Sequence, residues 1–468
     1  MDELLDNPLA TIAEAIRTKK TTSLAVTRGF LDRIDMVNPA LNALVYSTAE
    51  QALKLAEKAD LALKNQEPPG KLHGVPITIK DSLDTKDAIT TWGTLGRKDF
   101  RPGRDATCVA RLRDAGAIIM GKTNTPEFTM SFQTSNLVYG TTKNPFDTQR
   151  TSGGSSGGAA ALIAANATPM DIGTDTGGSI RLPCHFCGIA GIKPTTGRVP
   201  CTGNALPSSG LYAPLTQPGP MARYVDDLRF ILDIIQGPDN VDPHCVPGAT
   251  YECDDVKTMR IAYHLDNGIC TPTDSITSTL ASIVDFMKRE GFTLSEARPT
   301  GLEMAGLIFP RVIGADGEVL KALLEDSRTD TVSPNLKPSI GHTRQEPSAA
   351  EIAQTINLWH NYQSSMLGFF DDFDLLICPV NARTAHKHDE HEDLNAYTYT
   401  SAYNLTGWPG AVIRAGQDEL NLPIGVQIIA APFREDRCLT MAKWLETNLS
   451  TFAPPPVYAG RQELEAQT

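Results

Sequence analysis

The sequence predicts an α/β fold built around a buried sheet. Short apolar runs rich in β-branched residues alternate with segments of helical periodicity, a pattern typical of strands covered by helices. The 468 residues are 41% hydrophobic and 21% charged, which is the composition of an ordinary globular protein. Neither an internal repeat nor a low-complexity linker divides the chain. We therefore expect one domain over residues 1–468.

The first part of the chain predicts helices. Apolar residues at helical spacing begin at Leu9. Ser23 is predicted to cap a second helix that ends at Pro39, because proline disfavours continuation of a helix. Ser47 and Glu50 have the spacing of a capping box before a third helix.

Seven later runs predict strands, namely 75–80, 117–122, 169–173, 259–265, 373–380, 410–416 and 424–430. A helix of small residues is expected over 156–168, directly after a serine-glycine loop, and a last helix over 434–449. The turn-rich stretch 236–260 is predicted to be a surface excursion.

The charge and the cysteines limit the function classes. A formal net charge of -13 argues against a nucleic-acid partner and against anionic membranes, since both attract basic surfaces. The N-terminal residues lack the pattern of a signal peptide, and no run reaches the ~18 apolar residues of a spanning helix. Nine scattered cysteines fit reduced thiols, so we expect a cytoplasmic protein.

Two glycine-rich segments, GGSSGG (153–158) and GTDTGGSIRLP (173–183), flank the small-residue helix. Successive glycines can aim several N–H groups at one spot, which suits a phosphate or an oxyanion. The phosphate interpretation fails, because neither segment has the lysine of a P-loop and no G-x-G-x-x-G opens a helix.

A nucleophile elbow is a second interpretation, because Ser155 satisfies G-x-S-x-G. The residues before it have turn chemistry rather than the pattern of a buried strand, and the late histidines lie in the polar run AHKHDEHED (385–393). This interpretation is disfavoured. His386, His388 and His391 in that run are expected to form a solvated loop rather than a metal site.

A third interpretation combines both segments with Lys80. Ser179 follows an apolar strand and a glycine-rich turn, and a lysine buried at a strand end loses its proton more readily. Ser155 can supply the hydroxyl that bridges the two. The N–H groups expected to stabilise an oxyanion are those of Thr176, Gly177, Gly178 and Ser179.

In these stretches, and in LHGVPITIKDSLDT, AGAIIMGKTNTPEF and NLTGWPGAVIRAG, the sequence resembles the amidase signature family over nearly its whole length. The resemblance implies a Ser–cis-Ser–Lys triad in which Ser179 is the nucleophile, Ser155 the relay and Lys80 the base. It implies a cis peptide bond between Gly154 and Ser155, with Ser156 supporting the relay. The separations of 75 and 24 residues between the three are those of the family.

The resemblance also implies a large, mixed, twisted central sheet covered by helices on both faces. N-terminal helices would occupy about 8–65, a catalytic core about 70–235, and a variable, substrate-shaping part about 236–400. The activity implied is hydrolysis of amide bonds, with carbamate (urethane) and ester bonds open to the same acyl-enzyme chemistry. The cycle needs no metal and no cofactor. Expected substrate contacts are Thr129, Met130 and Ser131.

Plainer roles compete with several of these assignments. Lys80 alone could be the ion-pair partner of the adjacent Asp81. Asp175 is expected to shape its loop by hydrogen bonds to backbone amides, and Arg181 to be a structural ion-pair residue rather than a catalyst. The C-x-x-C of residues 184–187 has no second pair at zinc-finger spacing, so core thiols are expected.

The resemblance leaves the subgroup open. In the amidotransferase subunit that feeds ammonia to misacylated tRNA, an acidic residue precedes the NL-x-G-x-P stretch, and Tyr397 takes that place here. This difference favours a stand-alone amidase, a monomer or homodimer acting on small amides, anilides, carbamates or esters. Trp408, the segment 397–403 and the block 300–345 are expected to shape its pocket. The alternative is a non-catalytic or ammonia-donating subunit of a larger complex.

Overall fold

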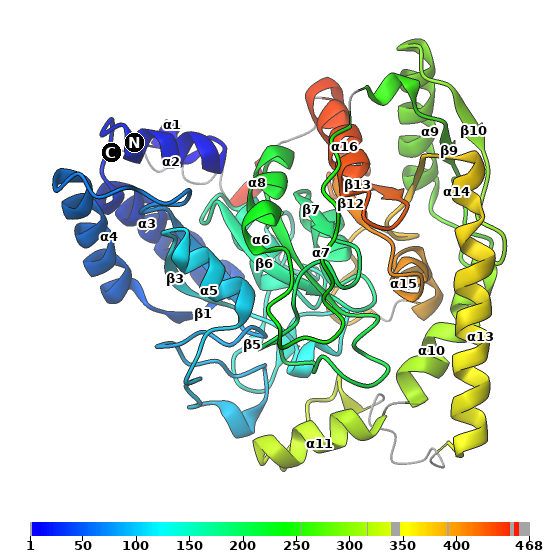
Figure 1. Ribbon diagram of the computed structural model, residues 1–468, viewed down its shortest axis with the longest axis horizontal. Coiled ribbons are helices and arrows are strands. Elements are labelled where there is room, and N and C mark those ends of the chain that lie inside the picture. The colour runs from blue at the N-terminus through cyan, green and yellow to red at the C-terminus, as the bar shows by residue number, and fades with distance from the viewer. Residues whose placement is uncertain are drawn as a thin grey trace.

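The computed structural model describes residues 2–253, 255–315, 317–337, 347–390, 393–449 and 454–457 (Figure 1). The strands are β1 Leu44–Ser47, β2 Pro76–Lys80, β3 Ile118–Thr123, β4 Ser135–Asn136, β5 Gly140–Thr141, β6 Met170–Asp175, β7 Ala190–Lys193, β8 Gln217–Ala222, β9 Ile261–Tyr263, β10 Leu294–Glu296, β11 Leu375–Pro379, β12 Gly410–Gln417 and β13 Pro423–Ala430.

The helices are α1 Asp2–Leu5, α2 Leu9–Arg17, α3 Ser23–Leu41, α4 Ala49–Lys64, α5 Thr107–Asp114, α6 Gly157–Ala164, α7 Arg181–Cys187, α8 Val225–Ile235, α9 Asp274–Arg289, α10 Ala305–Ala315, α11 Gly317–Ser327, α13 Ala349–Leu367, α14 Phe369–Asp372, α15 Thr398–Leu405 and α16 Glu435–Leu449. In the parts of the chain that are described, none of them has the length and apolar character to cross a membrane.

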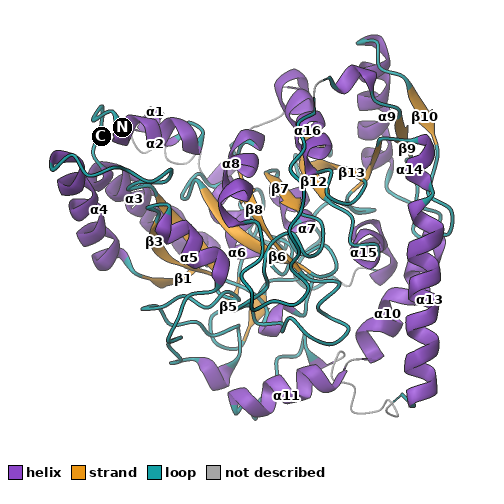
Figure 2. Cartoon of the chain, in the orientation of Figure 1, coloured by secondary structure: helices purple, strands orange, loops and turns teal. Residues whose placement is uncertain are grey.

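A mixed eight-stranded sheet forms the centre, in the order β10-β9-β11-β13-β12-β7-β8-β6 (Figure 2). Strand β9 pairs in parallel with β10 and β11, and the remaining pairs are antiparallel. This confirms the predicted fold class. A second sheet, in the order β1-β3-β2, stands apart from it, so the strand that ends at Lys80 does not belong to the large sheet.

Helices cover both faces of the large sheet because its strands are apolar on both sides. On β11, Leu375 and Ile377 belong to the buried cluster that includes residues of α8, α9 and α16, whereas Leu376 and Cys378 belong to the cluster that includes residues of α10, α13 and α15. On β12, Val412 packs with α6 and α7 instead. The alternation follows the two-residue period of a strand.

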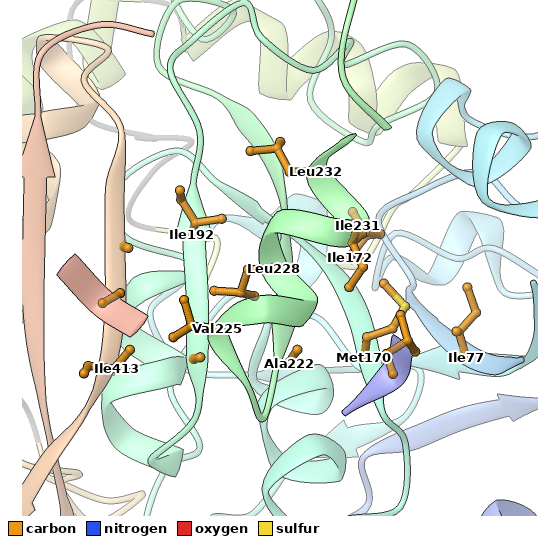
Figure 3. Packing of buried hydrophobic residues seen from close by; sticks show 14 of the residues in the cluster. Ile77, Met170, Ile172, Ile192, Ala222, Val225, Leu228, Ile231, Leu232 and Ile413 are labelled. Atoms are coloured by element: carbon orange, nitrogen blue, oxygen red, sulfur yellow. The ribbon is translucent and has the colours of Figure 1, made fainter. Parts of the chain in front are cut away.

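The largest apolar cluster extends across the boundary between the two sheets. Figure 3 shows Ile77 of β2 beside Met170 and Ile172 of β6, within the cluster that also buries α8. Strands β2 and β6 are the facing edges of the two sheets and pack against each other. We call this boundary the seam. It is the place where the predicted site residues meet.

Two expected helix ends were wrong. The first cap of α3 is Thr22, whose hydroxyl accepts a hydrogen bond from the Ala25 N–H, while the Ser23 hydroxyl donates to the Gly74 carbonyl. The helix also passes Pro39 and ends at Leu41, whose side chain is fully buried. Burial of Leu41 in the core outweighs the helix-breaking effect of Pro39, which lies exposed in the same turn.

The predicted capping box at Ser47 was also wrong. Ser47 is the last residue of β1, and α4 starts two residues later at Ala49. The hydroxyl of the N-cap residue Thr48 donates to the Ile119 carbonyl oxygen and accepts no capping hydrogen bond from the helix. Strand β8 was missed because its sequence, QPGPMA, has two prolines. These are two residues apart, so both missing N–H groups fall on the same edge of the strand.

Candidate active site

The seam brings three segments together. Lys80 is the last residue of β2, and Ser155 and Ser156 lie in the loop before α6. The glycine-rich turn that carries Ser179 follows directly after β6. Nearly every residue from 151 to 194 is buried, so this is an interior site rather than a surface loop.

Lys80 is surrounded by hydroxyl groups. Its Nζ lies 2.7 Å from Ser155 Oγ, 2.9 Å from Ser156 Oγ and 2.8 Å from Thr174 Oγ1, all within hydrogen-bond distance. Its side chain is fully buried. Burial lowers the pKa of Lys80 well below its usual value, against the opposing effect of the negative charges on Asp175 and Asp171. This environment favours an uncharged amine.

The two serine loops are joined through their backbones. The Ser156 N–H donates to the Ser179 carbonyl oxygen at 3.2 Å, and the Gly154–Ser155 peptide bond is cis, as the resemblance implies. The Ser155 side chain is fully buried, whereas Ser179 keeps 5% of its surface exposed. Lys80 and Ser155 are thus in contact, and the proton step from Ser179 to Ser155 stays a prediction.

Glycine is required at position 154 by a close approach of the chain. A Cβ there would lie 2.6 Å from the Ser131 carbonyl oxygen and from the Phe132 carbonyl carbon. Any side chain would push the 131–133 segment away from the serine loop. The expected contact residues Thr129, Met130 and Ser131 therefore lie in a segment that is held directly against this loop.

The expected oxyanion donors are not equally available. The Gly178 N–H already donates to Asp175 Oδ1 at 2.8 Å. The same carboxylate accepts from the Ile180 N–H at 3.1 Å. The N–H groups that remain for an oxyanion proposal are those of Thr176, Gly177 and Ser179.

Arg181 is an ion-pair residue, as expected, and its partner is Asp175, 3.0 Å away, with both side chains fully buried. Although burial acts to raise the pKa of Asp175, the Arg181 guanidinium and a hydrogen bond from Asn404 hold it well below the usual value. Arg181 also donates to Gln427 Oε1 at 2.7 Å and to Asn404 Oδ1 at 2.6 Å. The pair fastens the turn before Ser179 to β13 and α15.

Sequence reasoning missed Thr174, Asn404 and Gln427. Thr174 had a signal, since it precedes the glycine-rich turn on the strand that carries it. Gln427 is a polar residue inside an otherwise apolar strand, which is a signal for a buried hydrogen-bond partner. Asn404 lies inside a stretch that carries the resemblance to the family, but no local pattern indicates its role.

The competing role for Lys80, an ion pair with Asp81, is not what the structure shows. Lys122 Nζ is the cation beside Asp81, at 3.8 Å, and both side chains are buried. Lys122 also donates to the Leu83 carbonyl oxygen at 2.5 Å. Asp81 in turn accepts a hydrogen bond from the Thr91 hydroxyl.

Aromatic rings lie next to the glycine-rich turn. A Cβ at Gly177 would meet Phe309 Cζ of α10 at 2.8 Å and Phe132 Cζ at 3.4 Å. Phe132 stacks on Tyr397, with ring centroids 3.8 Å apart and planes 9° apart. Phe132 and Phe309 are half-buried, so their rings are partly open beside the turn. Thr400 Oγ1 donates to the Gly177 carbonyl oxygen at 2.8 Å.

Other expectations had mixed outcomes. Trp408 is 1% exposed and packs on Phe370 with centroids 4.5 Å apart, so it is a core residue and not a pocket wall. All nine cysteines are free, and Cys184 and Cys187 are buried thiols as expected.

The histidine run was expected to form a solvated loop, and in its described part Lys387, Asp389 and Glu390 are exposed as such a loop requires. His386 and His388 are half-buried, and the His386 carbonyl accepts from the Thr151 N–H at the start of the serine loop. His391 lies outside the described residues, as do residues 316 and 338–345 of the block 300–345.

A fully buried lysine held against serine hydroxyls beside a mixed sheet fits the class of amide-hydrolysing enzymes that the sequence resembles. The chain belongs to the Amidase family, whose model matches residues 25–439. It is 34% identical to a glutamyl-tRNA(Gln) amidotransferase subunit of Bdellovibrio bacteriovorus, over 94% of this chain and 96% of that protein.

Two further relatives carry the names of other amide-cleaving enzymes. The chain is 32% identical to an indoleacetamide hydrolase of Bradyrhizobium diazoefficiens, over 94% of this chain and 86% of that protein. The structure of a bacterial aryl acylamidase of the amidase signature family superposes with a TM-score of 0.85 at 25% identity, covering 94% of this chain and 96% of that one. The protein is an amidase by family and by fold.

Proposed function

We propose that this amidase works through an acyl-enzyme on Ser179, with Ser155 as proton relay and Lys80 as base. The observation that carries the proposal is the contact between a fully buried lysine amine and the Ser155 hydroxyl, at 2.7 Å. A buried amine with hydroxyl partners can be uncharged near neutral pH and can therefore accept a proton.

The proposed cycle uses these three side chains. Lys80 takes the proton of Ser155 while Ser155 takes that of Ser179, and Ser179 Oγ bonds to the substrate carbonyl carbon. The developing oxyanion accepts hydrogen bonds from the N–H groups of Thr176, Gly177 and Ser179, each commonly worth ~3 kcal/mol at the transition state. The proton returns through Ser155 to the leaving nitrogen as the C–N bond breaks. Water then hydrolyses the ester by the same relay.

We propose small amides, anilides, carbamates or esters with a flat apolar group as substrates of a protein that acts alone in the cytoplasm. Support comes from the aromatic rings of Phe132, Phe309 and Tyr397 beside the Gly177 turn. Tyr397 is 6% exposed and carries no charge at the position where the amidotransferase subgroup is expected to have an acid. The indoleacetamide hydrolase and aryl acylamidase relatives act on substrates of this kind by name.

A second candidate is the glutamine-hydrolysing component of an amidotransferase. It is favoured by 34% identity to a protein of that name over almost the whole of both chains. In that case a partner chain would be needed for full function, and the substrate would be glutamine.

One screen separates the two candidates. The purified chain is assayed alone against p-nitroanilides, aryl carbamates, primary aryl amides and glutamine, with release of amine or ammonia as the readout. Turnover of aryl amides at rates at least ~100-fold above that of glutamine supports the stand-alone amidase. Turnover of glutamine alone supports the amidotransferase component. Inactivity on all of them, together with no labelling by a fluorophosphonate, contradicts both.

A further inference from the structure

Asp171 is a buried carboxylate that the proposed cycle does not use. It lies on β6, four residues before Asp175, and its side chain is fully buried. Its Oδ2 accepts a hydrogen bond from Thr78 Oγ1 of β2 at 2.7 Å and one from Thr123 Oγ1 of β3 at 3.0 Å. One carboxylate thus bonds to both strands of the small sheet that end at the site.

These bonds cross the seam. Strands β2 and β6 belong to different sheets, so the two edges do not share the ladder of backbone hydrogen bonds that fixes neighbouring strands. Lys80 stands on one side of the seam, and Thr174 with the Ser179 turn stands on the other. The geometry of the base relative to its partners therefore depends on side-chain contacts across the seam.

The hydrogen bonds from Thr78 and Thr123 to Asp171, which we call the clamp, lie next to Lys80. Thr78 precedes Lys80 by two residues, so their side chains leave β2 on the same face. Thr123 is the register partner of Lys80 on β3. The Lys80 backbone N–H also faces the Asp171 carboxylate. A shift of Asp171 would move the strand end from which the lysine reaches Ser155.

We propose that Asp171 is a positioning residue for Lys80: its carboxylate clamps β2 and β3 onto β6, and its negative charge favours the protonated form of the lysine. The inference rests on the proposed function, because it assigns Lys80 the role of base. Asp171 itself touches neither the reacting serine nor the substrate carbonyl in this assignment.

The surrounding charges make the Asp171 charge effective. Asp175 raises the pKa of Lys80 more than Asp171 does, but its carboxylate is also ion-paired with Arg181. The side-chain hydrogen-bond partners of Asp171 are hydroxyls, its carboxylate also faces the Lys80 backbone N–H, and the cations that face it are Lys80 and Lys122. Lys122 is itself paired with Asp81. Burial raises the pKa of Asp171 to about 6, with the bonds from Thr78 and Thr123 opposing.

The charge of Asp171 should raise the pH at which Lys80 becomes a free base. Above pH 6 Asp171 is ionised and stabilises the ammonium form of Lys80, so it delays the appearance of the free base as pH rises. Asp171→Asn removes the charge and keeps an acceptor for Thr78. Thr78→Val removes a hydrogen bond of the clamp and keeps the charge. The two variants therefore separate the electrostatic from the geometric contribution.

The experiment is the second-order rate of fluorophosphonate labelling at Ser179 as a function of pH, which needs no knowledge of the substrate. Asp171→Asn is expected to move the acid limb to lower pH by about one unit. Thr78→Val is expected to reduce the plateau rate at least ~10-fold without moving the limb downward. The control is Asp227→Asn, which alters another buried aspartate, on α8, and should leave the profile unchanged.

The outcomes are distinguishable. A wild-type protein that is not labelled at Ser179 contradicts the proposed function. A labelled wild type with the same pH profile and plateau in Asp171→Asn and Thr78→Val overturns the role of Asp171 and leaves the proposed function intact. If Asp171→Asn does not fold, Thr123→Val is measured in its place, together with Thr78→Val. Plateau labelling rates that are unchanged in both threonine variants would overturn the role of the clamp.

Discussion

Two buried lysines lie near the ends of neighbouring parallel strands, Lys80 as the last residue of β2 and Lys122 one residue before the end of β3, and their surroundings differ. Lys80 on β2 lies among the hydroxyls of Ser155, Ser156 and Thr174. Lys122 on β3 lies 3.8 Å from the Asp81 carboxylate and donates to a backbone carbonyl. Neither side chain has any exposed surface.

The contrast shows that burial alone does not make a base. Burial lowers the pKa of Lys122 only to about 8, because the charges of Asp81 and other carboxylates oppose it. Burial also lowers the pKa of Lys80 well below its usual value, and the hydroxyls around this amine can donate to its neutral form as well as accept from its charged form. We therefore interpret Lys80 as the base and Lys122 as a structural cation that holds the 81–91 loop.

The strongest test of this contrast is the pair Lys80→Ala and Lys122→Met. Lys80→Ala is expected to lower kcat/KM at least ~10⁴-fold, because only this side chain can be the final proton acceptor. Lys122→Met should retain most of the activity per folded molecule. Both are measured with the best substrate of the screen, after circular dichroism has confirmed folding. Similar activity in Lys80→Ala and the wild type would refute the assignment.

Loss of the relay residue Ser155 should reduce activity less than loss of the base Lys80. Ser155→Ala is expected to leave a trace of activity, about 10²–10³-fold below the wild type, because water can replace the bridging hydroxyl. Steady-state kinetics under the same conditions give the ratio. If Ser155→Ala were as inactive as a Ser179→Ala variant and alone lost labelling, Ser155 would be the nucleophile.

Lys122 should contribute to the free energy of unfolding rather than to catalysis. Lys122→Met leaves the Asp81 carboxylate buried without its cation, and we expect the free energy of unfolding to fall by about 3 kcal/mol. The double variant Lys122→Met/Asp81→Asn should recover part of that loss, since both charges are then gone. Urea denaturation measures both values. A double variant no more stable than Lys122→Met would show that the two residues are not coupled.

The pH dependence of kcat/KM tests the assignment of Lys80 as the base, and it is the smallest of the expected effects. The cycle needs uncharged Lys80, so kcat/KM should rise about tenfold per pH unit below the pKa of this residue and then level off. Because burial lowers that pKa, the plateau is expected well below pH 10.5. A profile that stays flat down to pH 5 would contradict an amine as the base.

The sequence predicted what depends on local chemistry. The strand that ends at Lys80, the glycine turn before Ser179 and the small-residue helix after Ser155 all lie where the pattern indicated. Partners distant in sequence were not predictable in this way. Asp81 was adjacent to Lys80 in the chain, yet its cation is Lys122, 41 residues later. Trp408 was expected at the pocket, and only tertiary packing on α14 places it in the core.

Local chemistry also predicted the bonds of Asp175 to loop amides, one of which engages Gly178 among the four candidate oxyanion donors. The division into two sheets was not predictable in this way. Strand runs indicated a sheet, but no local pattern marks the seam between β2 and β6. Asn404 and Gln427 reach Arg181 from more than 200 residues away.

The proposed mechanism requires that Ser179 forms a covalent ester with help from uncharged Lys80. Peptide mass spectrometry of the protein after reaction with a fluorophosphonate tests this requirement without a known substrate. We expect an adduct on Ser179 in the wild type and in Lys122→Met, and a labelling rate reduced by orders of magnitude in Lys80→Ala. An adduct on Ser155, or labelling that is indifferent to Lys80, would contradict the mechanism.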